Sequence, residues 1–245
     1  MSMNPLHQFE VAVLHPLHVA GLDLSITNQA VWTFIAVAAI SLLFVAGVAN
    51  MKLVPGRLQA FVEMTYEFIH NLVKDNTGEE GLKYFPLILT LFLFLAGLNV
   101  AGMFPGSFTA TSQITTTAFM AVVVFAMVIA IGFKEQGLHF LGLFYPAGTP
   151  GYLAPLIVPL ELISFFARPL TLAVRLCANM VAGHVLMKIF ATFVIMLMGW
   201  FALTAVAPFV LLVALSGLEL FVALLQAYIF TVLTCVYLND ALHGH

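Results

Sequence analysis

Charged residues interrupt a long apolar stretch in the C-terminal part of the chain. Most residues between Leu156 and Leu238 are hydrophobic, yet five charged side chains lie among them. A charged residue at the centre of a membrane helix costs about 2.5–3.5 kcal/mol on insertion scales, so it needs a functional or structural reason. The five are Glu161, Arg168, Arg175, Lys188 and Glu219.

Arg175 is expected to lie too deep in the membrane for its charged group to reach the surface. It lies 14 residues after Glu161 and 13 before Lys188, so about 20 Å of helix separates it from either. Glu161 and Lys188 can reach the surface with their long side chains, and a purely structural role is an equally good interpretation for them. A guanidinium keeps its proton in proteins. Arg175 can therefore act only as a fixed positive charge: a counter-ion, an anion site or an electrostatic barrier.

Seven-residue spacings place the polar residues of this stretch on two helical faces. Residues seven apart drift by only about 20° around a helix. The two faces are therefore expected to border a common seam between neighbouring helices. One face carries Glu161, Arg168 and Arg175, with Asn179 one turn further, and the other carries Glu219 and Gln226.

A turn between the two helices would pair these polar residues by depth. If the chain reverses near residues 200–202, Arg175 lies level with Gln226, and His184 faces Glu219 nearer the outer surface. Histidine exchanges protons near neutral pH, and a carboxyl group can also bind and release one. A lone histidine in a membrane helix more often only packs and hydrogen-bonds. The match in depth with Glu219 favours a proton relay.

The composition predicts an all-α membrane protein. Of the 245 residues, 62% are hydrophobic and only 8% are charged, against roughly 25% charged in soluble domains. This excludes a cytosolic enzyme and a disordered protein, and a net charge of −3 gives no basic patch for nucleic acid. Both cysteines, Cys177 and Cys235, lie in apolar runs, so neither a disulfide framework nor a cysteine metal site is expected.

Apolar runs of about 20 residues predict about five transmembrane helices. A break near Gly199 to Pro208 divides the last run into a hairpin, and glycines and prolines make the preceding connection irregular. We expect an external N-terminal segment over 1–24, a first span over 25–51, a helical hairpin over 84–133, an irregular connection over 137–159 and a channel hairpin over 160–238.

A further helix, over 56–75, is amphipathic. A helix with one apolar and one polar face is typical of the membrane interface. Packing of the helix on the protein's own cytoplasmic face is an equally good interpretation, and both can hold at the same time. One face carries Leu58, Phe61, Val62, Thr65, Tyr66, Ile69, Leu72 and Val73. The other carries Arg57, Gln59, Glu63, Glu67, His70, Asn71 and Lys74.

Basic residues predict the orientation of the chain. The loop after the first span contains Lys52, Arg57, Lys74 and Lys83, whereas no Lys or Arg precedes that span. Because short cytoplasmic loops are enriched in Lys and Arg, the N-terminus is expected outside and the C-terminus in the cytoplasm. The first 24 residues lack the basic start of a cleavable signal peptide.

Two motifs resemble a known family. The run RLCANMVAGH from Arg175 to His184, followed downstream by QAYIFTVLT from Gln226, closely resembles subunit a of the F-type ATP synthase. The resemblance also covers Pro5 to Glu10, Gly97 to Ser112, and Pro159 to Glu161. Both motifs together are highly specific for that family.

The resemblance implies a function and a set of functional residues. Arg175 matches the essential stator arginine, which faces the carboxylate of each passing c subunit. Glu161 matches an inner-side position, and Lys188 stands where mitochondrial members often have histidine, so its role is open. Having His at 184 and Glu at 219 is similar to the mitochondrial and alphaproteobacterial arrangement. The matching channel positions are Asn179, His184, Glu219 and Gln226, and secondary candidates are Arg168, Lys188 and Tyr237.

The family's mechanism is then expected for the whole chain. The last two helices would form a strongly tilted hairpin against the c-ring, with two aqueous half-channels leading to the ring and Arg175 blocking a leak between them. The expected partners are the c-ring, the peripheral-stalk b subunits and lipid, in an energy-transducing inner membrane. No phosphate-binding GxxxxGK[ST] loop is present, so we expect no nucleotide chemistry in this chain. We also expect no cofactor, no metal site and no catalytic site.

Two other classes of function are less favoured. A secondary transporter could use Arg175 as an anion or carboxylate site, but internal duplication, which such folds predict, is not apparent. An intramembrane hydrolase needs a nucleophile and a base. The chain has no GxSxG or HExxH motif, and Ser164 and Ser216 have no evident base partner.

Overall fold

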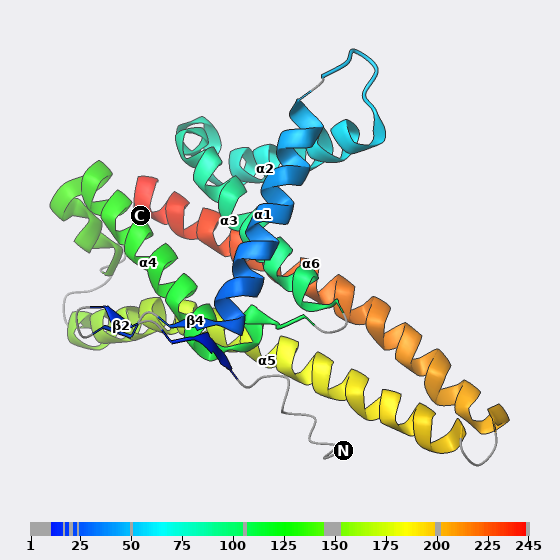
Figure 1. The fold of residues 1–245 in the computed structure, drawn as a ribbon. Coiled ribbons are helices and arrows are strands. Elements are labelled where there is room, and N and C mark those ends of the chain that lie inside the picture. The colour runs from blue at the N-terminus through cyan, green and yellow to red at the C-terminus, as the bar shows by residue number, and fades with distance from the viewer. Residues whose placement is uncertain are drawn as a thin grey trace.

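The protein folds into long helices, with a short strand-containing segment near the N-terminus (Figure 1). The computed structural model describes residues 11–16, 18–19, 22–23, 25–49, 51–104, 107–144, 153–198 and 202–243. Five helices in these ranges are long and apolar enough to cross a membrane. The expected all-α membrane fold with about five spans is therefore confirmed.

Five helices carry these spans. Thr27 caps the first of them, since its hydroxyl accepts a hydrogen bond from the Ala30 amide at 3.3 Å. Pro86 lies in the first turn of the next span, where a missing amide hydrogen costs little. The bounds are α1 (Asn28–Val48), α3 (Phe85–Gly102), α4 (Ile114–Gln136), α5 (Ala154–Met198) and α6 (Val206–His243).

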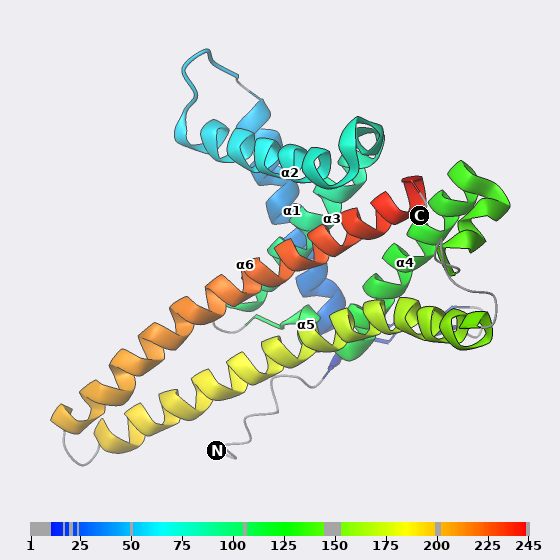
Figure 2. The same ribbon diagram turned by 180° about the vertical axis from the view of Figure 1, so that it is seen from behind.

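The last two helices are too long to stand upright in a bilayer. With 45 and 38 residues, α5 and α6 extend about 67 and 57 Å, whereas the hydrocarbon core is about 30 Å thick. They must therefore lie strongly tilted. They run side by side near the turn that joins them and diverge toward their far ends (Figures 1 and 2).

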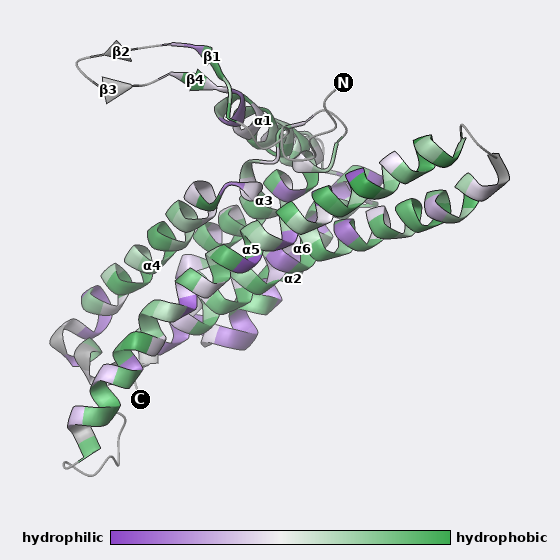
Figure 3. Ribbon diagram, turned by 90° about the horizontal axis from the view of Figure 1, so that it is seen from below, coloured by the Kyte–Doolittle hydropathy of each residue, from purple (hydrophilic) through white to green (hydrophobic). Residues whose placement is uncertain are grey.

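A buried core joins α5 and α6 to the other spans. Leu95 of α3, Met120 and Val124 of α4, Leu176 of α5 and Phe230 of α6 belong to one hydrophobic cluster. Outside this cluster most residues of α1, α5 and α6 are apolar but not buried by the chain itself (Figure 3). Such large apolar surfaces require lipid or other membrane subunits around them.

The amphipathic segment forms α2 (Arg57–Gly81), followed by the short 3-10 helix η2 (Leu82–Tyr84). Val62, Ile69 and Val73 are buried, and α2 contacts α1, α3 and α6. Leu58 and Phe61 remain exposed on its expected apolar face. Packing against the protein's own helices thus buries one part of the apolar face of α2. The other part stays exposed, as a helix in the membrane interface requires.

Three segments differ from the expected pattern. Two small antiparallel pairs join β1 (Val13–His15) to β4 (Ile26–Thr27) and β2 (His18–Val19) to β3 (Leu22–Asp23). The 3-10 helix η4 (Gly137–Phe144) follows α4, and α5 begins at Ala154, within the connection expected to be irregular through 159. Pro155 lies in the first turn, where a missing amide hydrogen costs little. Pro159 lies inside the helix, where it removes the bond to the carbonyl four residues earlier. Residues 199–201 of the expected turn lie outside the described residues, and η6 (Ala202–Ala205) leads into α6.

Candidate functional site

His184 of α5 and Glu219 of α6 face each other across the tilted hairpin. The distance from His184 Nε2 to Glu219 Oε1 is 3.7 Å, and the two side chains are only 10% and 6% exposed. Two groups that can exchange protons therefore meet in a buried place, as the pairing by depth predicted. If the two helices are straight and antiparallel, the same pairing places Arg175 level with Tyr228, which is two residues beyond the expected Gln226.

A glycine makes this approach possible. A Cβ at Gly183 would lie 2.7 Å from Glu219 Oε1 and 2.9 Å from its Cδ, closer than atoms normally come. Any larger residue on α5 at this position would displace the carboxyl group. Gly183 thus determines where Glu219 lies relative to His184.

The Glu219 carboxyl group has no hydrogen bond to the part of the chain that the structure describes, although both oxygens are buried. Burying a charged carboxylate without a partner is expensive, so such a group needs water or a proton. The arrangement is suited to a group that binds and releases a proton.

Polar residues of the turn between α3 and α4 complete the surroundings of His184, and sequence reasoning missed them. Thr109 Oγ1 lies 2.9 Å from His184 Nε2. The turn contains the 3-10 helix η3 (Ala110–Ser112), and Cys177 Sγ donates a hydrogen bond to the Ser112 carbonyl. A cluster of threonines and serines in an otherwise apolar chain was the available signal.

Asn99 was also missed. It is fully buried on α3 and donates from Nδ2 to the Ala223 carbonyl of α6 at 2.9 Å, one turn from Glu219. Its Oδ1 has no hydrogen bond among the described residues. A lone asparagine in an apolar span was the signal that could have found it.

A cleft lies between α5 and α6, on the side of Arg175 that is away from His184 along α5. It has a volume of about 430 Å³ and is lined by Arg168, Thr171 and Arg175 of α5 and by Leu233 and Tyr237 of α6, among others. The structure thus brings together the two predicted arginines and the secondary candidate Tyr237.

Arg168 links this cleft to Glu161. Its Nη2 lies 3.8 Å from Glu161 Oε1, and its guanidinium lies 5.8 Å from the centre of the Tyr237 ring. The side chains of Arg168 and Glu161 are 40% and 32% exposed, so the pair is open to solvent or to a partner. Glu161, Arg168 and Arg175 thus follow one another along α5, and the two arginines line the cleft.

The remaining predicted residues differ in exposure. The Arg175 side chain is exposed, Gln226 is buried, and Asn179 and Lys188 are half-buried. Lys188 lies one turn beyond His184 on α5. The fixed charge therefore points away from the chain's own core, whereas the proton-exchanging pair lies inside it.

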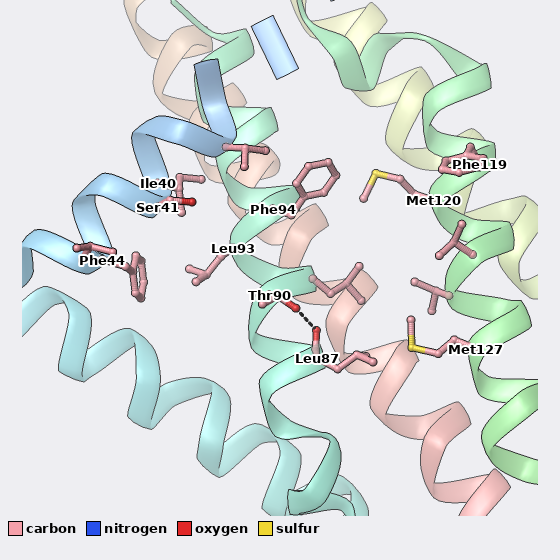
Figure 4. A pocket seen from close by; sticks show the side chains of 15 residues that line it. Ile40, Ser41, Phe44, Leu87, Thr90, Leu93, Phe94, Phe119, Met120 and Met127 are labelled. Carbon is pink, nitrogen blue, oxygen red and sulfur yellow. Dashed lines mark hydrogen bonds between the residues drawn. The ribbon is translucent and has the colours of Figure 1, made fainter. Parts of the chain in front are cut away.

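A second cavity is unsuited to protons. It has a volume of about 660 Å³ and lies between α1, α3 and α4, away from the hairpin seam (Figure 4). Only Ser41 and Thr90 among its lining residues are polar, and Thr90 donates its hydroxyl proton to the Leu87 carbonyl. In the described part of the chain, no group of three or more His, Cys, Asp or Glu residues could hold a metal ion.

Comparison with known proteins adds an independent finding. A profile of the ATP synthase A chain family matches residues 30–239. ATP synthase subunit a of Rhizobium leguminosarum bv. trifolii (strain WSM2304) is 48% identical, and that of Rhodopseudomonas palustris (strain TIE-1) is 47% identical; both alignments cover 100% of each chain. The subunit a of Parvibaculum lavamentivorans is 48% identical over 99% of this chain and 95% of its own.

The match covers nearly the whole chain, including the seam between α5 and α6, and favours this family over the transporter and hydrolase interpretations. The chain is thus a non-catalytic, multi-pass membrane subunit of an ATP synthase Fo sector. It belongs to the ATP synthase A chain family, whose members form the proton channel that drives rotation of the c-ring.

Proposed function

We propose that protons cross this subunit by two separate routes that meet at Arg175. The outer route passes Glu219 and His184 and involves Asn179 and Gln226. The inner route follows the cleft past Arg168 and Tyr237 toward Glu161. Each route ends at the exposed face of the hairpin, where a c subunit binds or releases its proton.

The observation that carries this proposal is the exposure of Arg175. Val174, beside it in the chain, is 44% exposed, and the exposed guanidinium borders the cleft that α5 forms with α6. A permanent positive charge in such surroundings needs an anionic partner. The carboxylate of a c subunit, which family membership implies as the neighbour, supplies it.

Electrostatics explains why the charge must be permanent. A deprotonated c-subunit carboxylate is attracted to Arg175, whereas a proton is repelled by it. A protonated carboxyl group can turn into lipid, but a charged one cannot, because burying it is too costly. Protons therefore pass only with rotation of the ring, driven by about 2.3 kcal/mol per charge for each 100 mV of membrane potential.

The surroundings of the subunit follow from the same proposal. With the N-terminus outside and the C-terminus in the cytoplasm, the Lys- and Arg-containing loop after α1 lies on the cytoplasmic side. Family membership also implies the peripheral-stalk b subunits as neighbours and a bacterial inner membrane as the location.

Crosslinking to the c-ring tests the proposed surface. A cysteine replacing Val174, beside Arg175, should form a disulfide with a cysteine placed next to the c-subunit carboxylate. A cysteine replacing Phe119, which is 69% exposed on α4, is the matched control and should not. Crosslinking from position 119 but not from 174 would refute the proposed surface.

A further inference from the structure

The turn between α3 and α4 places one hydroxyl between His184 and a backbone carbonyl. Thr109 is 5% exposed. Its Oγ1 lies 2.9 Å from His184 Nε2 and 3.1 Å from the Gly102 carbonyl oxygen. A hydroxyl has one proton to donate and can also accept. It can therefore satisfy the carbonyl or the imidazole nitrogen as a donor, but not both at once.

The protonation of His184 decides which bond the hydroxyl makes. When Nε2 carries a proton, Thr109 accepts from it and donates to the Gly102 carbonyl. When Nε2 has lost its proton, Thr109 can turn and donate to that nitrogen instead. The Gly102 carbonyl can then accept the Ser107 hydroxyl proton, at 2.9 Å. That hydroxyl also lies 2.8 Å from the Phe104 carbonyl, which has the Ser107 amide as a second donor at 3.0 Å. Neither state leaves a buried polar atom of this group without a partner, which would otherwise be costly.

We propose that Thr109 is a positioning residue for the His184–Glu219 relay, with a hydroxyl that turns between the Gly102 carbonyl and His184 Nε2 as that nitrogen loses and regains its proton. This inference rests on the proposed function. A proton from water binds Nδ1 and makes the ring cationic, and the Nε2 proton then passes to a Glu219 carboxylate oxygen. The ring is left neutral and protonated at Nδ1. The ring resets when one water gives a proton to Nε2 and another takes the proton from Nδ1, while Glu219 passes its proton onward, so each cycle moves one proton from water through Glu219.

The position of Thr109 keeps this geometry in place. Cys177 lies seven residues before His184 on α5 and binds the Ser112 carbonyl of the same turn. The turn is thus held against the α5 face that carries the histidine. The ionisable groups facing His184 are Glu219 of α6 and, one turn along its own helix, Lys188. Thr109 adds a hydrogen bond without adding a charge.

Substitutions at Thr109 test the proposal in membrane vesicles that contain the complete ATP synthase. T109V and T109A remove the hydroxyl, and proton-driven ATP synthesis should fall about tenfold, as expected when a buried donor loses its partner. T109S keeps the hydroxyl and should retain most activity. T77V is the matched control, because Thr77 is equally buried but lies on α2, where its hydroxyl donates to the Val73 carbonyl of its own helix.

H184Q separates the failure of this inference from the failure of the proposed function. If H184Q lowers synthesis but T109V and T109A behave like T77V, Thr109 has no positioning role and the relay stands. If H184Q has normal synthesis, the relay itself is wrong. Rates are compared per assembled complex. Equal loss in T109S and T109V would assign Thr109 to packing, and failure of only the hydroxyl-free variants to assemble would assign its hydroxyl to holding the turn; either result would overturn the inference.

Discussion

The guanidinium of Arg175 and the carboxyl group of Glu219 occupy opposite environments. The arginine is exposed on the hairpin surface, whereas the carboxyl group is 6% exposed beside a histidine and has no hydrogen bond among the described residues. A permanent charge serves as a barrier only where it meets the moving partner. A group that exchanges protons works best where water and a second exchanging group can reach it.

Replacing Glu219 by glutamine separates proton exchange from packing. Glutamine has nearly the same shape but cannot bind or release a proton at physiological pH. We expect E219Q to lower proton flux through the complex by tenfold or more. E63Q, which changes an α2 carboxylate away from the seam, should have little effect. Equal mild effects of both variants in a vesicle pumping assay would contradict the relay.

Gly183 offers a steric test of the same pair. In G183A the new methyl group would lie 2.7 Å from Glu219 Oε1, so the carboxyl group must move away from His184. Proton flux should fall several-fold while the subunit still assembles. G217A is the matched control, because a Cβ there meets no atom within 4 Å. An unimpaired G183A would show that the spacing of the pair is unimportant.

At the scale of elements, the buried face of the tilted hairpin packs against the other spans and so fixes the position of the site. Leu176 of α5 is 1% exposed in the core, whereas Leu170 of the same helix is 62% exposed. Within a membrane, packing rather than removal of apolar surface from water holds helices together. The two faces of α5 should therefore respond differently to truncation.

Leu176→Ala should lower the thermal stability of the subunit, since a cavity in a well-packed core costs about 2 kcal/mol or more. Leu170→Ala creates no cavity within the subunit and should leave stability unchanged. The measurement is the temperature at which detergent-solubilised subunit a aggregates. Equal midpoints for the two variants would contradict the assigned core.

Periodicity and hydropathy predicted the elements better than the contacts between them. Apolar length alone predicted the five spans, and spacing about a turn predicted that His184 meets Glu219. The proximity of Thr109 could not be predicted in this way, because it depends on the path of a turn rather than on a helical period. The N-terminal strand pairs were missed as well, since two- and three-residue strands leave no clear alternation.

At the scale of the whole molecule, the proposed orientation puts the N-terminal segment outside and the C-terminus in the cytoplasm, which agrees with five candidate spans in the described residues. Val13, in the N-terminal segment, and Leu53, in the loop after α1, are 56% and 106% exposed. In a variant without Cys177 and Cys235, a membrane-impermeant maleimide should label V13C from outside and L53C only from the cytoplasmic side. The reverse pattern would invert the proposed orientation and both routes.

The central claim is that the fixed charge of Arg175 keeps two proton routes apart. The most direct measurement imposes a proton gradient on vesicles that contain the complete enzyme with R175A, and follows ATP synthesis and proton flux together. We predict that synthesis falls to background, at least about 100-fold, while protons continue to cross without it, because the barrier is gone. K134A, which removes a positive charge at the end of α4, should remain coupled. Coupled synthesis in R175A at the K134A rate would contradict the account.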